Sequence, residues 1–295
     1  MTATPPATQH KIFSPARVWA IASNTLLELI RLKVFYFLLI FALVVIGVLF
    51  LYRDIFQDEF QSLKDGSLGA MSIFSLLLSI LPTAMLLPKD IEDRTLYTIL
   101  AKPVPRFEYL LGKFLGVLLL LFIAVSLMSL VFLTVLFCRM EVAIGEATRS
   151  AHGALLNERL SAIQHDAFSE SLLPGIFIVY LKAAVGASIT LLLSTFATSM
   201  IFTVMMSFVV QIIGHLQSIA RDAAIETVGI THLSKIFYML LALLIPDLSA
   251  FSLVDEMVTG TAIPFDLFAK TAALGGIYVA VYFFVAYFIF MGKEL

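Results

Sequence analysis

Charged residues are scarce in this chain. Asp, Glu, Lys and Arg make up 14% of its 295 residues and hydrophobic residues make up 60%, whereas soluble proteins average ~25% charged and ~45–50% apolar residues. A soluble core of this size cannot hold that apolar excess, so much of it must face lipid. The composition therefore predicts an integral membrane protein.

Net charge and cysteine are also low. The formal net charge is −2, and nucleic-acid binding normally requires a clustered basic face, so we expect no nucleic-acid partner. Cys138 is the one cysteine, which excludes an intrachain disulfide and a cysteine-rich metal site. The five histidines form no pair such as H-E-x-x-H, and no apolar run holds a nucleophile beside a base. We therefore expect no catalytic residue, no metal site and no cofactor bound by this chain.

Long apolar runs are abundant. A helix needs ~20 apolar residues to cross ~30 Å of hydrocarbon, and six segments have this length, the fourth of them containing Lys182. The predicted spans are 34–52, 69–87, 114–138, 172–197, 199–217 and 271–291. The predicted fold is an all-α, polytopic membrane helical bundle with six transmembrane helices, preceded by a disordered tail at 1–13.

Two helices are expected at the membrane surface. The first begins at Pro15 with Ser14 as its cap. Its polar residues Arg17, Asn24, Glu28 and Arg31 share a face opposite Val18, Ala22, Leu29 and Leu32. This N-terminal segment is either an interfacial helix or a positively charged topology anchor, or both. The second helix, 236–245, is too short to cross, ends before Pro246, and is expected to be re-entrant or interfacial.

Lys and Arg are more frequent in every second segment between the predicted spans, which indicates how the chain is oriented in the membrane. They are enriched in 1–33, 89–113 and 292–295 relative to 53–69, 139–171 and 218–270. Positive residues accumulate on the cytoplasmic side. We therefore expect both termini and the loop 89–113 in the cytoplasm, and short amphipathic helices in the external segment 139–171.

The loop at 89–113 has the pattern of a short amphipathic helix. Asp90 can act as its N-cap, acidic residues follow in the first turn, and Pro103 ends it. Its apolar stripe consists of Leu96, Ile99 and Leu100. Such a helix either docks into a groove on a soluble partner or simply rests on the bilayer.

This loop resembles the signature loop of type-2 ABC-transporter permeases, which commonly read E-x-x-T-L, then L-x-x-P-V-x-R, then G-K. The matching residues, in the same order, are Glu92, Thr95, Leu96, Leu100, Lys102, Pro103, Arg106, Gly112 and Lys113. ASNTLLELIRLKVF at 22–35, Pro246–Phe251 and Phe290–Leu295 are also similar. Arg94 departs from the family, whose members often have Gly there. The resemblance covers essentially the whole chain.

The resemblance implies that 14–295 is a single transmembrane permease domain of an exporter in the bacterial inner membrane. Such a subunit pairs with a second copy or a paralogue and binds a cytoplasmic ABC ATPase. By position, Asp90–Ala101 would be the coupling helix. The ATPase-coupling residues would be Asp90, Glu92, Asp93, Arg94, Thr95, Leu96, Ile99, Leu100, Lys102, Pro103 and Arg106.

An ATP site of the chain's own is not expected. The phosphate-binding pattern G-x-x-x-x-G-K-[ST] is absent, because Phe114 follows Lys113 and Glu294 follows Lys293. ATP and Mg would therefore bind to the partner ATPase. Nothing in the sequence indicates the transported substrate.

Polar residues recur every four positions along the fifth predicted span: Thr203, Ser207, Gln211 and His215. They predict either hydrogen bonds between helices or the lining of a translocation path. Lys182, in the fourth span, could reach the membrane surface, pair within the bundle or face a cavity.

Two other functions compete with the permease. An ion-driven secondary transporter would have acidic residues inside its spans, and every Asp and Glu lies outside the predicted ones. A membrane scaffold in a motility or assembly complex could share the fold without moving a solute.

Overall fold

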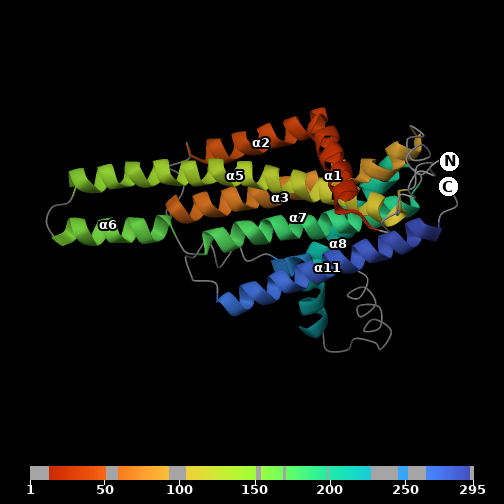
Figure 1. The fold of residues 1–295 in the computed structure, drawn as a ribbon. Coiled ribbons are helices and arrows are strands. Elements are labelled where there is room, and N and C mark those ends of the chain that lie inside the picture. Colours follow the sequence, from red (N-terminus) through yellow and green to blue (C-terminus); the bar gives the residue numbers. More distant parts are fainter. Residues whose placement is uncertain are drawn as a thin grey trace, which may run out of the picture.

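The computed structural model describes residues 13–50, 59–92, 104–150, 154–168, 171–197, 199–226, 245–251 and 264–292. All regular structure in these ranges is helical (Figure 1). The elements are α1 (Pro15–Ile30), α2 (Lys33–Leu49), α3 (Glu59–Glu92), α5 (Arg106–Ser150), α6 (Ala154–Ala167), α7 (Leu172–Phe196), α8 (Met200–Glu226), the 3-10 helix η1 (Leu248–Phe251) and α11 (Phe265–Gly292). The prediction of an all-α fold is confirmed for this part of the chain.

Five described helices are long and apolar enough to cross a membrane: α3, α5, α7, α8 and α11. They coincide with the last five predicted spans. The first predicted span falls on α2, which passes the same criterion only together with α1, and the two helices are bent by 68° at their junction. The predicted re-entrant helix at 236–245 lies, apart from Ile245, outside the described residues.

The third predicted span is part of a much longer helix. α5 has 45 residues, or ~68 Å at 1.5 Å per residue, which is more than twice the ~30 Å hydrocarbon core. Its last turns extend beyond the bundle, and α6 packs back against them as a helical hairpin (Figure 1). The expected helices in 139–171 are therefore the end of α5 together with α6.

One side chain ties this hairpin to the bundle. Lys64 of α3 is only 2% exposed and donates a hydrogen bond of 2.5 Å to the carbonyl oxygen of Asp166. The carbonyls in the last turn of a helix have no partner within the helix. Lys64 therefore satisfies one of these carbonyls at the end of α6.

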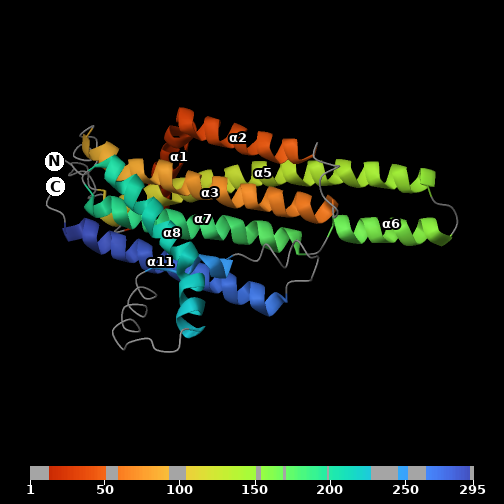
Figure 2. The ribbon, with the colours of Figure 1, turned by 180° about the vertical axis from the view of Figure 1, so that it is seen from behind.

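α7 forms the centre of the bundle. It packs between α3 and α11, and nearly every residue from Ile178 to Thr195 is buried (Figure 2). α2 packs on α3 and α5, whereas α8 contacts α3, α7 and η1. Lys182, in the middle of α7, is only 8% exposed and so lies inside the bundle rather than reaching its outer surface.

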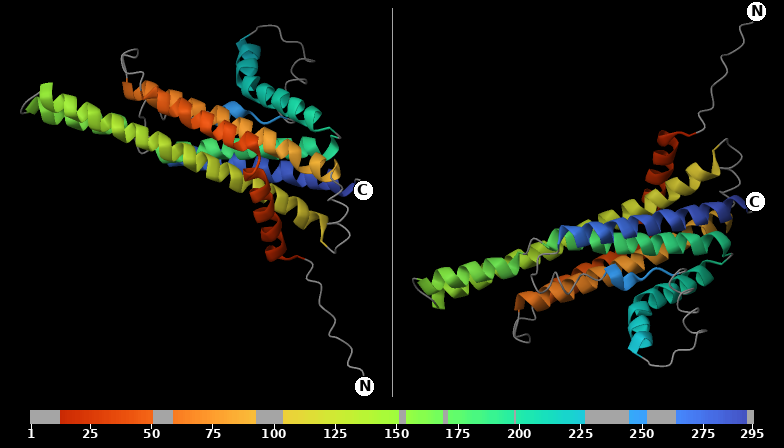
Figure 3. Two further views of the ribbon diagram at one scale, coloured as in Figure 1. Left: turned by 90° about the horizontal axis from the view of Figure 1, so that it is seen from above. Right: turned by 90° about the horizontal axis from the view of Figure 1, so that it is seen from below.

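α1 leaves the bundle at a steep angle, and its apolar face packs on α5 (Figure 3). The predicted apolar residues Val18, Ala22 and Leu29 are indeed buried. The close approach of α1 to α5 requires Gly116 of α5. A Cβ at this position would lie 2.7 Å from the Cβ of Thr25 and 2.9 Å from the carbonyl oxygen of Ala22. The predicted apolar stripe of α1 therefore packs against protein rather than against the bilayer.

Candidate functional site at the base of the loop 93–103

Only residues 90–92 of the predicted coupling helix Asp90–Ala101 are described. Asp90, Glu92 and Arg106 belong to the structure, whereas the other predicted coupling residues lie outside the described ranges: Asp93, Arg94, Thr95, Leu96, Ile99, Leu100, Lys102 and Pro103. The prediction that Asp90 caps a new helix is wrong, because α3 continues without a break through Glu92. The helix therefore continues past Leu87, the predicted end of the span, and contains Pro88.

Asp90 belongs instead to a network of polar side chains, which we call the charged base: Glu28, Lys89, Asp90, Tyr109 and Lys113. It joins α1, the end of α3 and the start of α5. The ammonium of Lys113 lies 2.8 Å from Oδ2 of Asp90 and 3.6 Å from Oε2 of Glu28. Tyr109 donates a hydrogen bond to Oδ2 of Asp90, and Lys89 lies 2.6 Å from Oε1 of Glu28.

Burial makes the pairing in the charged base necessary. Asp90 and Lys113 are 6% and 5% exposed, and a buried charge without a partner is strongly destabilising. Burial by itself raises the pKa of Glu28, but hydrogen bonds and attraction from Lys89 and Lys113 outweigh it, so the pKa of Glu28 lies below its ordinary value. Lys89 and Lys113 therefore favour the ionised form of Glu28.

A second ion pair fixes the start of α1. Glu108 is fully buried, and Arg17 approaches both of its oxygens, with Nε 2.6 Å from Oε2 and a terminal nitrogen 2.8 Å from Oε1. The backbone N–H of Ser14 also donates to Oε1, at 2.7 Å. Bidentate arginine–carboxylate pairs fix orientation as well as distance. α1 is thus tied to the first turn of α5 at its N-terminus and to the charged base near its C-terminus.

The far side of the loop is tied to the C-terminal helix. Arg106 donates a hydrogen bond of 2.7 Å to the carbonyl oxygen of Met291 at the end of α11. The neighbouring Phe107 packs edge-on against Phe283 and Tyr287 of the same helix. The predicted coupling residue Arg106 therefore contacts α11, whereas Glu92 at the other end of the loop is exposed.

The polar stripe of α8 faces the inside of the bundle. Thr203, Ser207 and Gln211 are at most 2% exposed, and Nδ1 of the half-buried His215 lies 3.0 Å from the carbonyl oxygen of Gln211. A Cβ on Gly186 of α7 would lie 3.0 Å from Nε2 of Gln211 and 2.9 Å from Oγ of Ser79. The stripe thus lies in the interface of α8 with α7 and α3.

This interface is incompletely satisfied. Among the described residues, Oγ1 of Thr83, Oγ of Ser207 and Nε2 of Gln211 are buried and have no hydrogen-bond partner. Unpaired polar groups in a helix interface are costly and normally bind water or a ligand. Polar side chains of α8 are therefore buried where this helix contacts α3 and α7.

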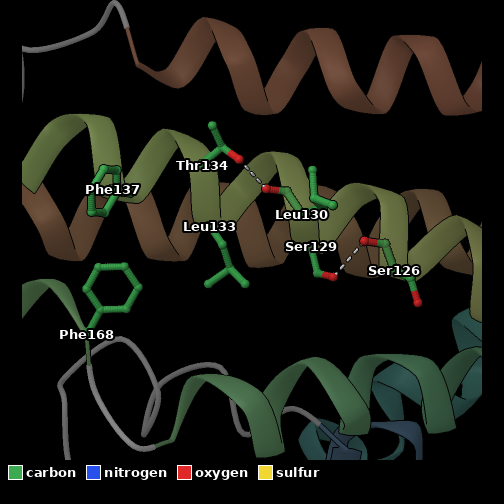
Figure 4. Close-up of a pocket in the computed structure, with 7 residues that line it drawn as sticks. All are labelled: Ser126, Ser129, Leu130, Leu133, Thr134, Phe137 and Phe168. Atoms are coloured by element: carbon green, nitrogen blue, oxygen red, sulfur yellow. Dashed lines mark hydrogen bonds between the residues drawn. The ribbon is translucent and has the colours of Figure 1, made fainter.

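An open groove of about 580 Å³ lies along the outer side of α5, lined by that helix and by Phe168 (Figure 4). Two of its hydroxyls bond within α5: Ser129 donates to the carbonyl of Ser126, and Thr134 to that of Leu130. The remaining lining is aliphatic or aromatic. The groove therefore offers an apolar surface within the predicted third span.

Several residues of the charged base were not predicted as functional. Glu28, Lys89, Tyr109 and Lys113 lie in three separate segments, and only their tertiary contacts join them. A usable signal was nevertheless present in the sequence, since oppositely charged residues flank apolar runs of one predicted helical bundle. In the described ranges, no three His, Cys, Asp or Glu side chains are grouped so as to hold a metal ion.

Compared with models of protein families and with curated proteins, the chain matches none. Its class therefore follows from the fold. An all-helical chain with five helices able to cross a membrane, and a sixth if α1 and α2 count as one span, is an integral membrane protein.

Proposed function

We propose that this chain is the permease subunit of an ABC exporter in the bacterial inner membrane, with both termini in the cytoplasm. The observation that carries the proposal is the motif from Glu92 to Lys113, whose two ends are joined to α1 and α11 by the charged base and by Arg106. A separate ATPase supplies ATP and Mg, and a second copy or a paralogue completes the transporter.

The contacts at the base of the loop suit mechanical coupling. A force on a loop moves helices only if the loop ends are held firmly to them. Asp90 holds the end of α3 to Lys113 of α5, and Arg106 holds the start of α5 to α11. Movement of the loop 93–103 by the ATPase would therefore shift α3, α5 and α11 together with α1.

The polar interface supplies the candidate translocation path. Ser207 and Gln211 of α8 have buried polar atoms without a partner in the described structure. His215 lies on the same helix, and Lys182 lies on α7, which packs against it. In this proposal, a shift of α3 relative to α8 opens this interface to a polar substrate. Alanine at Gln211 and His215 would then lower transport and substrate-stimulated ATPase activity; unchanged rates would remove the path assignment.

The coupling proposal is tested by co-expressing the chain with a candidate ABC ATPase. We expect Glu92→Arg and Leu96→Asp to abolish co-purification of the ATPase, or to uncouple its activity from transport. Glu158→Arg is the matched control, because Glu158 is an exposed carboxylate on α6, at the opposite end of the molecule. Normal co-purification and transport with both loop variants would refute the proposal.

The scaffold alternative is favoured by one observation, the hairpin of α5 and α6. This hairpin extends past the membrane-crossing helices and exposes most of its residues, which suits binding of an external protein. Transport assays in vesicles separate the two functions: ATP-dependent movement of any candidate solute supports the permease, and its absence despite an active, bound ATPase supports the scaffold.

A further inference from the structure

A polar groove lies at the corner between α1 and α2. It has a volume of about 440 Å³ and is lined by Asn24, Leu27, Glu28, Arg31, Leu32 and Lys89, which we call the corner groove. We propose that the corner groove binds the headgroup phosphate of an anionic glycerophospholipid. The inference requires only a membrane protein and is independent of the proposed transport function.

The charges of the corner groove fit a phosphate. The negative charge of Glu28 is already balanced by two lysines. Lys89 lies 2.6 Å from its Oε1, and Lys113 lies 3.6 Å from its Oε2. Arg31 is exposed, and in the described part of the chain it makes no side-chain hydrogen bond or ion pair. A guanidinium binds phosphate oxygens through two parallel N–H groups. The groove therefore combines one unused guanidinium with the amide of Asn24.

The corner groove also has an apolar part. Leu27 is 55% exposed, and Leu32, in the turn before α2, also lines the groove. A phospholipid requires both surfaces at once: polar donors for the phosphate and apolar contacts where the acyl chains begin. A free phosphate ion would gain nothing from the two leucines, so the lining favours a lipid.

The corner groove lies at the level expected for the lipid headgroups of a membrane. After Lys33 at its start, α2 has no charged residue and exposes Phe37, Ile40 and Phe41 on its outer side, so it suits the hydrocarbon core. α1 turns away from it by 68° and exposes Trp19, a residue enriched at membrane–water interfaces. The groove lies where the two helices meet, and therefore where the polar and apolar layers of a leaflet meet.

Native mass spectrometry of the full chain, released from detergent, measures this binding directly. Phosphatidylglycerol and phosphatidylcholine with identical acyl chains are added in turn, and the bound fraction of each is compared. We expect phosphatidylglycerol to bind about fivefold more strongly, as one cation near the membrane surface contributes ~1 kcal/mol toward an anionic lipid. Equal binding of the two lipids would overturn the proposal.

Two variants locate the site. Arg31→Gln should lower the preference for phosphatidylglycerol to about onefold, since it removes the unused guanidinium. Lys33→Gln is the matched control, because Lys33 is an exposed cation two residues away that does not line the groove. Retention of most of the preference in Lys33→Gln supports the corner groove. An equal loss in both variants would show attraction to general positive charge and refute the site.

Discussion

At the scale of single residues, pairing in the charged base decides which charges can be buried. Asp90 and Lys113 are nearly inaccessible and 2.8 Å apart, whereas Asp266 and Lys270 on α11 form an ion pair of 2.6 Å in which both side chains are more than 70% exposed. Exposed pairs contribute little because water and salt screen them, but breaking a buried pair leaves an uncompensated charge. Two ion pairs of similar length are therefore expected to contribute unequally to stability.

Removing one partner from each pair tests this difference. Asp90→Asn should lower the free energy of unfolding by about 3 kcal/mol, because Lys113 loses its nearest anion. Asp266→Asn should change it by less than ~0.5 kcal/mol. Denaturant unfolding in the same detergent measures both. The double variant Asp90→Asn with Lys113→Met should recover part of the loss; no recovery would contradict an uncompensated charge as its cause.

Gly116 tests how closely α1 and α5 must approach. Gly116→Val places new atoms where Thr25 and the backbone of Ala22 already lie, so we expect a loss of about 1–3 kcal/mol. Gly276→Val on α11 is the control, since a Cβ there meets nothing within 4 Å. Thermal unfolding compares them, and a similar midpoint for both variants would mean that α1 moves away without cost.

At the scale of elements, the hairpin of α5 and α6 depends on few contacts with the bundle. α6 packs mainly on the end of α5, with a weaker contact to α3. Lys64 makes its hydrogen bond at this contact and is itself buried. An element held at so few points should open locally before the bundle unfolds.

Lys64→Met should therefore loosen α6 selectively. A hydrogen bond from a charged group contributes roughly 1.5–3 kcal/mol, and methionine keeps the length of the side chain without the donor. We expect faster amide hydrogen exchange in 154–167 and unchanged exchange in α7. Lys270→Met, in an exposed pair on α11, is the control. Equal exchange in α6 of both variants would show that Lys64 does not hold the hairpin.

At the scale of the whole molecule, the two chemically distinct ends are far apart. The charged base and the end of α11 lie at one end of the bundle, and the hairpin lies at the other (Figures 1 and 3). An α5 of ~68 Å separates them by more than the thickness of a bilayer. A membrane crossed by these helices would therefore leave the loop 93–103 and the hairpin on opposite sides.

Labelling with a membrane-impermeant maleimide tests this topology in intact cells. In a Cys138→Ser background, Glu158→Cys on the hairpin should react from outside, and Glu92→Cys should react only after permeabilisation. Both positions are exposed in the structure, so a difference in labelling reports the side of the membrane. The reverse pattern would place the loop outside and exclude coupling to a cytoplasmic ATPase.

The membrane class, the all-α fold and the approximate positions of five spans could be predicted from the sequence. The physical reason is that an uncharged apolar run of this length has no alternative to a helix in lipid. It also placed Val18, Ala22 and Leu29 on one face of α1, because helical periodicity is local.

The partners of these helix faces could not be predicted from periodicity and are known from the packing of the helices. The last turns of α5 pack against α6, and the last turn of α3 is joined to α5 by Asp90 and Lys113. The close fit of α1 against Gly116, the burial of Lys182 and the joining of Glu28, Asp90 and Lys113 into one network all bring together segments that are distant in the chain. Periodicity identifies the face of a helix, but the partner of that face is a property of the assembled bundle.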